Sequence, residues 1–258
     1  MGCAFILTTP VAGDDTLDEL TAVGLKILQA KSGYRFSLDP VLLCGFISSI
    51  KNSRVVDLGT GNGVIPLLLS SRIEAKQLIG VEIQLQMVER ARRSVVLNGL
   101  DGFIQIVHAD IRELQKIMAA GSCDVVTANP PYRVKSSGRN AANGERCTAR
   151  HEIYGGLSDF LRAAAFLLNS GGRFYMVYLA ERLPELLAEM RCSKVEPKRL
   201  RLVHSRIDEP ARMVLVEGRK NGKPGMRVEP SLVIYKGEGR DYSDDVLAMY
   251  ATMAISNQ

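Results

Sequence analysis

Hydrophobic and polar positions follow two different periods along most of the chain. From residue 54 onward, short runs rich in Val, Ile and Leu alternate with stretches in which apolar residues recur every three to four positions. The first pattern is typical of buried strands and the second of amphipathic helices. The runs predict strands at 54–58, 78–82, 103–108, 124–128 and 173–179, and the periodic stretches predict helices at 64–72, 85–98, 158–169 (with Ser158 as N-cap) and from Pro184 onward.

Strands that alternate with helices indicate a mostly parallel sheet with helices on both of its faces. Three later runs, at 199–204, 212–217 and 228–235, have no long helix between them. We therefore expect these C-terminal strands to pair antiparallel at the edge of the sheet. The fold class is α/β, and in the first of these runs Arg199 and Arg201 should share one face.

The first 50 residues are less regular. We expect residues 1–23 to be a loose lead-in, 25–29 to be a strand, and Tyr34–Phe36 to be its hairpin partner. Asp39 is placed to cap a helix whose apolar body runs over 41–50, with Pro40 at its first position. This predicts an N-terminal extension with a lid over 1–50 and a catalytic domain over 51–258. A hairpin that only covers the core is the alternative for the lid.

Composition excludes several classes of protein. The chain is 46% hydrophobic and 24% charged, which is typical of a globular protein and not of a disordered one. We find no apolar run long enough to cross a membrane and no signal-peptide pattern. The five cysteines are scattered without a CxxC pair, so we expect no disulfide framework, no metal site and a cytoplasmic location. We also expect a monomer.

The net charge of +5 is concentrated in two segments. Residues 191–223 hold ten Lys or Arg against four Asp or Glu, and residues 133–152 hold five against two. Such clusters suit an anionic polymer, although a solvated basic face is an equally simple interpretation. The candidate nucleic-acid contacts are Arg133, Lys135, Arg139, Arg146, Arg150, His151, Lys198, Arg199, Arg201, Arg212, Arg219 and Lys220.

A glycine-rich turn follows the first strand of the regular alternation. Residues 57–63 read Asp-Leu-Gly-Thr-Gly-Asn-Gly, and this spacing differs from the GxGxxG of dinucleotide-binding folds. Glu82 ends the next strand, where a carboxylate can accept both hydroxyls of a ribose. Asp110 follows the third strand and is placed to accept a hydrogen bond from an adenine amino group, or to cap a helix. Three successive strands therefore end in acids, as in class I S-adenosylmethionine-dependent methyltransferases.

The tetrapeptide Asn129-Pro130-Pro131-Tyr132 follows the fourth strand. Its prolines hold the backbone rigid, so that the Asn129 amide oxygen and the Pro130 carbonyl are presented together at the carboxyl edge of the sheet. Two acceptors that grip the N–H groups of a planar amine can direct its lone pair at a methyl group. Tyr132 can stack on a planar substrate. The motif therefore indicates methyl transfer to an exocyclic amine, with no strong base required.

Taken together, these segments resemble the bacterial tRNA1(Val) adenine-N6 methyltransferases. The resemblance rests on residues 25–29, 33–39, 57–63, 129–132, 149–152 and 215–218, and it spans most of the chain. It implies a class I, Rossmann-like fold with a seven-stranded sheet, S-adenosylmethionine as methyl donor with S-adenosylhomocysteine as product, and tRNA as substrate. It implies cofactor contacts from Tyr34, Phe36, Asp57, Gly59, Thr60, Gly61, Asn62, Glu82, Ile83, Asp110, Ile111 and Asn129, and a catalytic turn of Asn129, Pro130, Pro131 and Tyr132.

Three alternatives remain open at this stage. The same tetrapeptide occurs in glutamine methyltransferases of release factors, but these carry a helical N-terminal domain for which 50 residues are too few. Methylation of an amino group in rRNA is a second alternative. The third is a non-catalytic RNA-binding module on the same fold, which the intact cofactor turn and tetrapeptide argue against.

Overall fold

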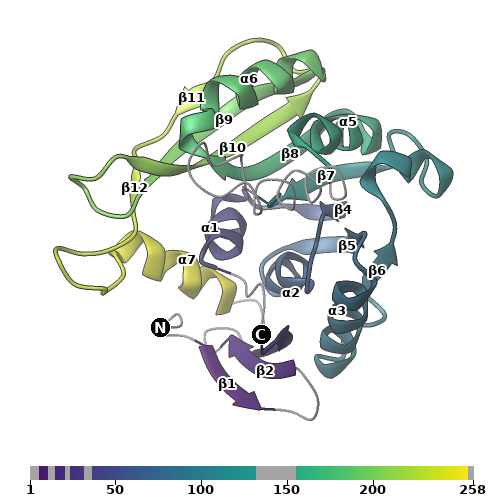
Figure 1. Cartoon of the computed structure of the whole chain (residues 1–258). Coiled ribbons are helices and arrows are strands. Elements are labelled where there is room, and N and C mark those ends of the chain that lie inside the picture. The colour runs from purple at the N-terminus through teal and green to yellow at the C-terminus, as the bar shows by residue number, and fades with distance from the viewer. Residues whose placement is uncertain (1–5, 11–14, 21–23, 32–36, 132–154, 255–258) are drawn as a thin grey trace, which may run out of the picture.

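The computed structural model describes residues 6–10, 15–20, 24–31, 37–131 and 155–254 (Figure 1). The predicted lid residues Tyr34 and Phe36, together with Tyr132 and the whole basic segment 133–152, lie outside these ranges. Among the described residues, no helix combines the length and apolar character that crossing a bilayer requires.

A nine-stranded sheet forms the centre of the molecule, in the order β11-β9-β10-β8-β7-β4-β5-β6, with β12 also paired to β9. Five of its strands run parallel to one another, in the order β8-β7-β4-β5-β6, and they are the five strands predicted from the β/α alternation. The antiparallel pairs β8–β10 and β10–β9 complete the seven expected strands. The strand bounds are β4 Lys51–Leu58, β5 Glu74–Glu82, β6 Ile104–His108, β7 Cys123–Ala128, β8 Leu168–Leu179, β9 Val195–His204, β10 Ala211–Lys220, β11 Arg227–Val228 and β12 Leu232–Val233.

The last predicted strand, 228–235, differs from the expectation in two ways. It is split into β11 and β12, and both pair with β9 in parallel, not antiparallel. Pro230 lies between them and has no N–H to donate to a ladder, which explains the break. The direction follows from the register. Lys220, the last residue of β10, lies opposite Val195, the first residue of β9. The chain therefore leaves β10 beside the start of β9, and a strand that then follows the outer side of β9 has the same direction as β9.

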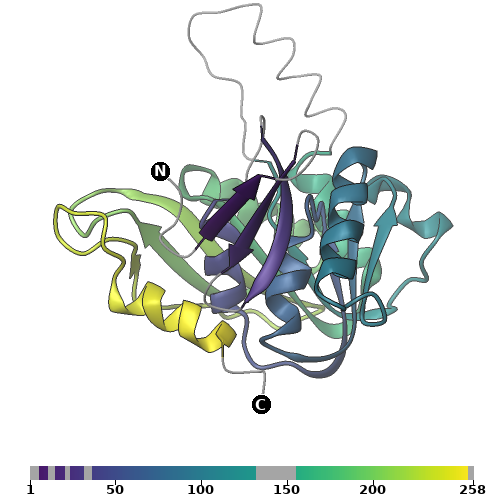
Figure 2. The ribbon, with the colours of Figure 1, turned by 90° about the horizontal axis from the view of Figure 1, so that it is seen from below.

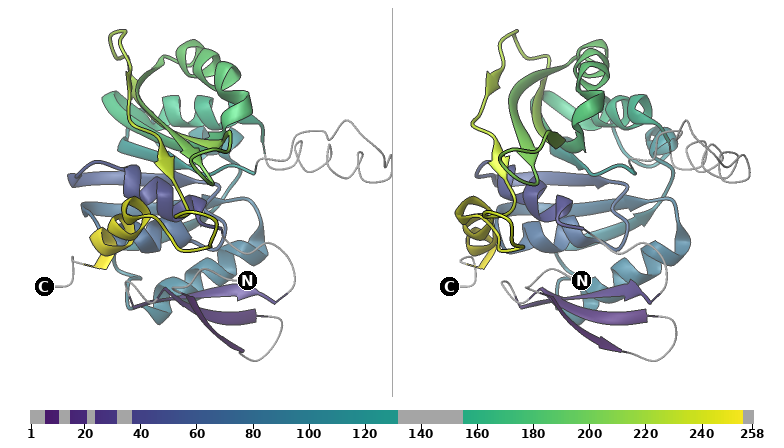
Figure 3. Two further views of the ribbon diagram at one scale, coloured as in Figure 1. Left: turned by 90° about the vertical axis from the view of Figure 1, so that its left-hand side faces the viewer. Right: turned by 60° about the vertical axis from the view of Figure 1, so that its left-hand side comes forward.

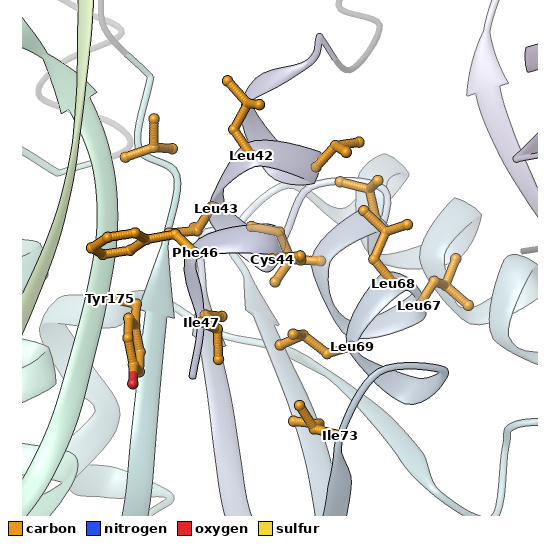
Figure 4. Packing of buried hydrophobic residues seen from close by; sticks show 14 of the residues in the cluster. Leu42, Leu43, Cys44, Phe46, Ile47, Leu67, Leu68, Leu69, Ile73 and Tyr175 are labelled. Carbon is orange, nitrogen blue, oxygen red and sulfur yellow. The ribbon is translucent and has the colours of Figure 1, made fainter. Parts of the chain in front are cut away.

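Helices cover both faces of the sheet, as predicted (Figure 1, Figure 3). One face packs against α1, α2, α3 and α7, and the other against α5, α6 and the 3₁₀ helix η1. Figure 4 shows side chains of α1 and α2 packed together with Tyr175 of β8 in the first of these clusters. The helix bounds are α1 Asp39–Phe46, α2 Val64–Ser70, α3 Leu85–Leu97, η1 Ile111–Lys116, α5 Leu157–Leu167, η2 Ala180–Arg182, α6 Leu183–Cys192 and α7 Asp244–Ala254.

Two predicted helix caps are wrong. α1 is capped by Leu38, so Asp39 lies in its first turn, and the helix ends at Phe46 instead of continuing to Ile50. α5 is capped by Gly156 and not by Ser158. The cause at α5 is Asp159, whose carboxylate accepts the Gly156 N–H at 2.8 Å and so satisfies the helix start two residues earlier. α1 packs into the core although it precedes residue 50, and the division into 1–50 and 51–258 stays a prediction.

The predicted loose lead-in contains two strands. β1 (Ile6–Pro10), β2 (Asp15–Leu20) and β3 (Leu25–Ala30) form an antiparallel sheet in which β3 pairs with β2. The predicted hairpin partner of β3, Tyr34–Phe36, lies outside the described residues. The polar composition of β2 concealed it, because its acids find partners that a sequence pattern does not reveal. Asp15 is buried and forms ion pairs with Arg90 and Arg93 of α3.

The small sheet lies beside α3 (Figure 2). Side chains of Ser94 and Asn98 bind its strand β3 in the way that a neighbouring strand would. The Asn98 side chain accepts the Lys26 N–H at 2.8 Å and donates to the Lys26 carbonyl at 2.7 Å. The Ser94 hydroxyl accepts the Leu28 N–H at 2.9 Å. Because these bonds satisfy the outer backbone groups of β3, the small sheet is docked on α3, the helix that begins directly after the end of β5.

Candidate functional site

The carboxyl ends of four parallel strands bring the predicted site residues to one edge of the central sheet. Leu58 at the end of β4 lies opposite Val81 of β5 on one side and Ala128 of β7 on the other. Glu82 in turn lies opposite His108 of β6. The glycine turn therefore stands between Glu82 and Asn129, which each follow a strand that is directly paired to β4.

The glycine turn has the tight conformation that its sequence predicts. Gly59, Gly61 and Gly63 have φ angles of 66°, 55° and 81°, which side chains with a Cβ rarely adopt. The Thr60 N–H donates to the Val81 carbonyl at 2.9 Å and closes the turn over β5. A Cβ on Gly61 would meet nothing within 4 Å, so this part of the turn presents open backbone to a ligand.

Glu82 holds the turn in place. One carboxylate oxygen accepts the Gly61 N–H and the other accepts the Gln84 N–H, both at 2.9 Å. The side chain is 4% exposed, so it is almost completely removed from bulk water. Each oxygen retains a free lone pair after these bonds, so both predicted hydroxyl contacts of a ribose fit this carboxylate.

Asp57 is a buried acid at the end of β4. Thr127 of β7 donates its hydroxyl to one carboxylate oxygen at 2.7 Å. Burial raises the pKa of Asp57 to about 7, and the nearby charge of Glu82 acts in the same direction, while the hydroxyls of Thr60 and Thr127 oppose both. A neighbouring cation would return this pKa toward its ordinary value. Thr127 was not among the predicted site residues, because threonine is common in strands and its position in the sequence gives no sign of a contact with Asp57.

Several buried polar atoms around the turn have no donor or acceptor in the described part of the chain. They are the side-chain oxygen of Asn62, the second carboxylate oxygen of Asp57 and the hydroxyl of Thr60. The Thr60 hydroxyl still lowers the pKa of Asp57, so the last two atoms have at most each other. Buried polar groups are almost always paired, so these atoms point to a missing polar ligand. S-adenosylmethionine offers an ammonium and two ribose hydroxyls as donors, and this set of acceptors fits the expected cofactor.

Asp110 has a structural partner at the end of β6. Its carboxylate caps η1 by accepting the Arg112 N–H at 2.8 Å, and the Arg112 side chain binds both oxygens. These hydrogen bonds hold the pKa of Asp110 below its ordinary value. The helix-capping alternative is therefore present in the structure, and an adenine contact from Asp110 stays a prediction. Ile83 is half-buried and Ile111 is buried in the core beside η1.

The catalytic turn leaves β7 next to the glycine turn. Asn129 is half-buried, Pro130 is buried and Pro131 is exposed. After the segment outside the described residues, the chain is described again from Gly155, where a Cβ would lie 3.3 Å from Ile111. The described ends of this segment therefore lie beside Asn129 and η1, on the edge where the cofactor residues gather.

The predicted nucleic-acid contacts within β9 and β10 are divided between two edges of the sheet. Arg212 begins β10 next to Leu179, on the same edge as Asn129. Arg219 and Lys220 end β10 beside the start of β8, at the opposite edge, and Lys198 lies near the start of β9. Segment 191–223 therefore does not line one face next to Asn129, because antiparallel strands carry its cations across the whole sheet.

Arg199 and Arg201 share one face as predicted, but their guanidinium groups are engaged inside the protein. Arg199 binds Glu217 at 2.7 Å, Glu229 at 2.9 Å and the Phe46 carbonyl at 3.0 Å, and it lies 4.2 Å from the Phe46 ring centroid. Arg201 binds Asp245 of α7 and the Pro230 carbonyl. Both arginines thus join the strands to the helices above them.

Replacing Arg199 with alanine is expected to lower the free energy of unfolding by about 3 kcal/mol, because it leaves the partly buried Glu217 carboxylate without its cation and removes one of the two cations that Glu229 binds. Urea denaturation followed by circular dichroism measures this loss. The control is Arg212→Ala, which removes a cation whose side chain is 72% exposed and should change stability by no more than about 0.5 kcal/mol. Equal stability of the two variants would contradict the structural role.

Gly80 is a further position that sequence patterns did not single out. A Cβ there would lie 2.8 Å from the methyl group and 2.9 Å from the hydroxyl of Thr60. Gly80→Ala is therefore expected to displace the glycine turn and to destabilise the fold by about 1–3 kcal/mol. Gly102→Ala is the matched control, since a Cβ on Gly102 meets nothing within 4 Å. Thermal unfolding compares the two, and a Gly80→Ala protein as stable as the control would refute the close approach.

Comparisons with known proteins identify the family of this chain. The profile of the methyltransferase small domain family matches residues 39–190. A tRNA1(Val) (adenine(37)-N6)-methyltransferase of Vibrio campbellii is 24% identical over 83% of this chain and 86% of its own length. The protein of that name from Histophilus somni is 28% identical over 84% and 89%.

Solved structures share the fold. A predicted O-methyltransferase of Agrobacterium tumefaciens superposes with a TM-score of 0.67 and 22% identity, over 84% of this chain and 97% of its own. A geranyl diphosphate C-methyltransferase of Streptomyces coelicolor A3(2), in complex with S-adenosyl-L-homocysteine, superposes with a TM-score of 0.52 and 13% identity over 70% and 78%.

Proposed function

Because the chain belongs to the methyltransferase small domain family, we propose that it transfers a methyl group from S-adenosylmethionine to the N6 amino group of an adenine in tRNA. The observation that carries this proposal is the placement of Asn129 and Pro130 directly beside the glycine turn, on the strand paired to β4. A donor held by that turn and an amine held by Asn129 would meet at one edge of the sheet.

The chemistry requires positioning more than acid–base catalysis. Bound S-adenosylmethionine supplies a methyl group on a sulfonium, which is a good leaving group. The Asn129 amide oxygen and the Pro130 carbonyl accept the two N–H bonds of the adenine amine and orient its lone pair. The N6–carbon bond forms as the sulfur–carbon bond breaks, and N6 then releases a proton to water. Prealigned acceptors of this kind lower the barrier through orientation and electrostatics.

The buried acids would hold the cofactor. Glu82 accepts the ribose hydroxyls with the lone pairs that its two backbone hydrogen bonds leave free. The unpaired oxygen of Asp57 accepts from the ammonium, which would also keep this carboxyl ionised. Gly61 allows the ligand to approach the backbone closely. Contacts from Tyr34, Phe36 and Asp110 belong to the same proposal.

The named relatives suggest the finer identity of the substrate. They are tRNA1(Val) (adenine(37)-N6)-methyltransferases, and we propose the same tRNA and the same adenine for this chain. An adenine in a loop leaves its stack at lower cost than one in a helix, which suits an enzyme that must reach an exocyclic amine. The basic segment 133–152 is proposed to contact the phosphate backbone, and a tRNA substrate favours a cytoplasmic location.

Methyl transfer from labelled S-adenosylmethionine to unmodified tRNA tests the proposal. We expect N6-methyladenosine in the nucleoside digest, and none when the adenine 3′ of the anticodon is replaced by guanine. A release factor in a parallel reaction is the protein-substrate control. Label in the release factor and not in the tRNA would move the function to protein glutamine.

A further inference from the structure

A cavity lies at the edge of the sheet opposite to the proposed active site. It has a volume of about 650 Å³, and its lining comes from the starts of β4, β7 and β8, the end of β10, and β9 and β11. β7 connects the two sites, since Asp124 lines the cavity and Asn129 follows the other end of the strand. At about 3.3 Å per residue, these positions are about 17 Å apart.

The lining of this cavity carries more cations than anions. Five basic side chains face it, and only two acids do. The basic residues are Arg173, Lys198, Arg199, Arg219 and Arg227, and the acids are Asp124 and Glu217. Both acids already have partners, because Asp124 accepts from Asn169 at 2.7 Å and from the Arg54 N–H at 2.9 Å, and Glu217 pairs with Arg199.

Two pairs of arginines lie directly opposite each other on neighbouring strands, and only one pair is neutralised. Arg199 faces Arg227 across β9 and β11, and the Glu229 carboxylate binds both, at 2.9 and 3.1 Å. Arg173 faces Arg219 across β8 and β10. Within the described residues this second pair has no ion pair, and Arg219 donates only to the Gly171 carbonyl, at 2.9 Å. Like charges directly opposite are destabilising, so this position calls for an anion.

From this contrast we propose that the cavity binds a phosphate group between Arg173 and Arg219. Paired guanidinium groups match the oxygens of a phosphate through charge-assisted hydrogen bonds. The expected source is a backbone phosphate of the bound tRNA, and this part rests on the proposed function. The phosphate would neutralise the charges of Arg173 and Arg219, as the Glu229 carboxylate neutralises those of Arg199 and Arg227. A free phosphate-bearing compound has the same chemistry and is distinguished by experiment.

Thermal unfolding in inorganic phosphate tests the site itself, with sodium chloride at the same ionic strength as reference. The wild-type midpoint is expected to rise by about 3 °C at phosphate concentrations well above Kd, since a ligand that binds only the folded state stabilises it. Arg173→Gln and Arg219→Gln should lose this rise. Lys116→Gln, which removes a cation on η1 that is 62% exposed, should keep it. No phosphate-specific rise in the wild type, or an equal rise in Arg173→Gln, would overturn the proposal.

A charge swap provides an independent arm. Arg219→Glu places a carboxylate opposite Arg173, so this variant should be at least as stable as the wild type without phosphate and should not respond to it. A loss of stability in both Arg219→Glu and Arg219→Gln would mean that Arg219 only supports the fold, which contradicts a ligand role.

Binding to tRNA identifies the source of the phosphate. Arg173→Gln should weaken tRNA binding about 3- to 10-fold and reduce the slope of log K against log salt by about 1, as expected for one lost phosphate contact. If the phosphate response is lost but tRNA binding is unchanged, the tRNA source is excluded. If the wild type neither binds nor methylates tRNA, the proposed function fails, and the phosphate titration still decides the site.

Discussion

Asn129→Ala is expected to lower kcat for methyl transfer by about 10³-fold, because it removes one of the two acceptors that orient the amine. The affinity for S-adenosylmethionine should stay within a few-fold of the wild-type value. The reason is that the glycine turn is closed by Val81 and Glu82 and not by the catalytic turn. Single-turnover kinetics with saturating tRNA measures the first quantity, and calorimetry measures the second.

The two readouts separate catalysis from binding in the same variant. If cofactor binding were lost together with activity, Asn129 would belong to the cofactor site and not to the amine. If kcat fell less than about tenfold, the Pro130 carbonyl alone would orient the amine, and the two-acceptor mechanism would be incorrect.

Asp57→Asn is expected to weaken S-adenosylmethionine binding by about 10- to 100-fold, because it removes the charge that the cofactor's ammonium would meet. The same change should stabilise the cofactor-free protein at neutral and alkaline pH. The Asp57 carboxyl is buried, and its pKa is raised from 3.8 to about 7. Asparagine has nearly the same shape and remains neutral at every pH.

The pH dependence follows from proton binding. Between about pH 4 and pH 7 the folded protein holds a proton on Asp57 that the unfolded chain has released. This contribution to stability, on the order of a few kcal/mol, is complete below about pH 4 and is lost as pH rises through 7. The unfolding midpoint of Asp57→Asn should therefore match that of the wild type near pH 4 and exceed it by several degrees at pH 8. A constant difference across this range would show that Asp57 is ionised in the folded protein at all of these pH values.

The parallel part of the sheet could be predicted because its inner strands hold apolar runs that are buried on both faces, and the edge strand β6 alternates between buried and exposed residues. The glycine turn and the tetrapeptide were recognised for a related reason, since glycine and proline restrict the backbone in ways that sequence displays. β2 was missed because its stability comes from Asp15 reaching Arg90 and Arg93 of α3, and such pairing is visible only in three dimensions.

The partners of the charged residues in the C-terminal strands could not be predicted from the sequence either. A count of cations does not distinguish Arg199, which lies under α1 with two acids, from Arg173, which was not predicted and has no ion pair among the described residues. Thr127 escaped notice for its part, because only the register of β7 beside β4 brings its hydroxyl to Asp57. In each case the function of a side chain depends on what lies across a strand pair.

The pairing of Leu58 with Ala128 has a consequence for how such a protein can diversify. The distance between the glycine turn and the catalytic turn is set by the hydrogen bonds between the central strands β4 and β7. Changes in the peripheral connections therefore leave this distance intact. Insertions after Pro131, or a different small sheet on α3, could redirect the enzyme to another amine while the reacting groups kept their separation. In evolutionary terms the reaction is conserved by the centre of the fold, and the choice of substrate is free to drift at its margins.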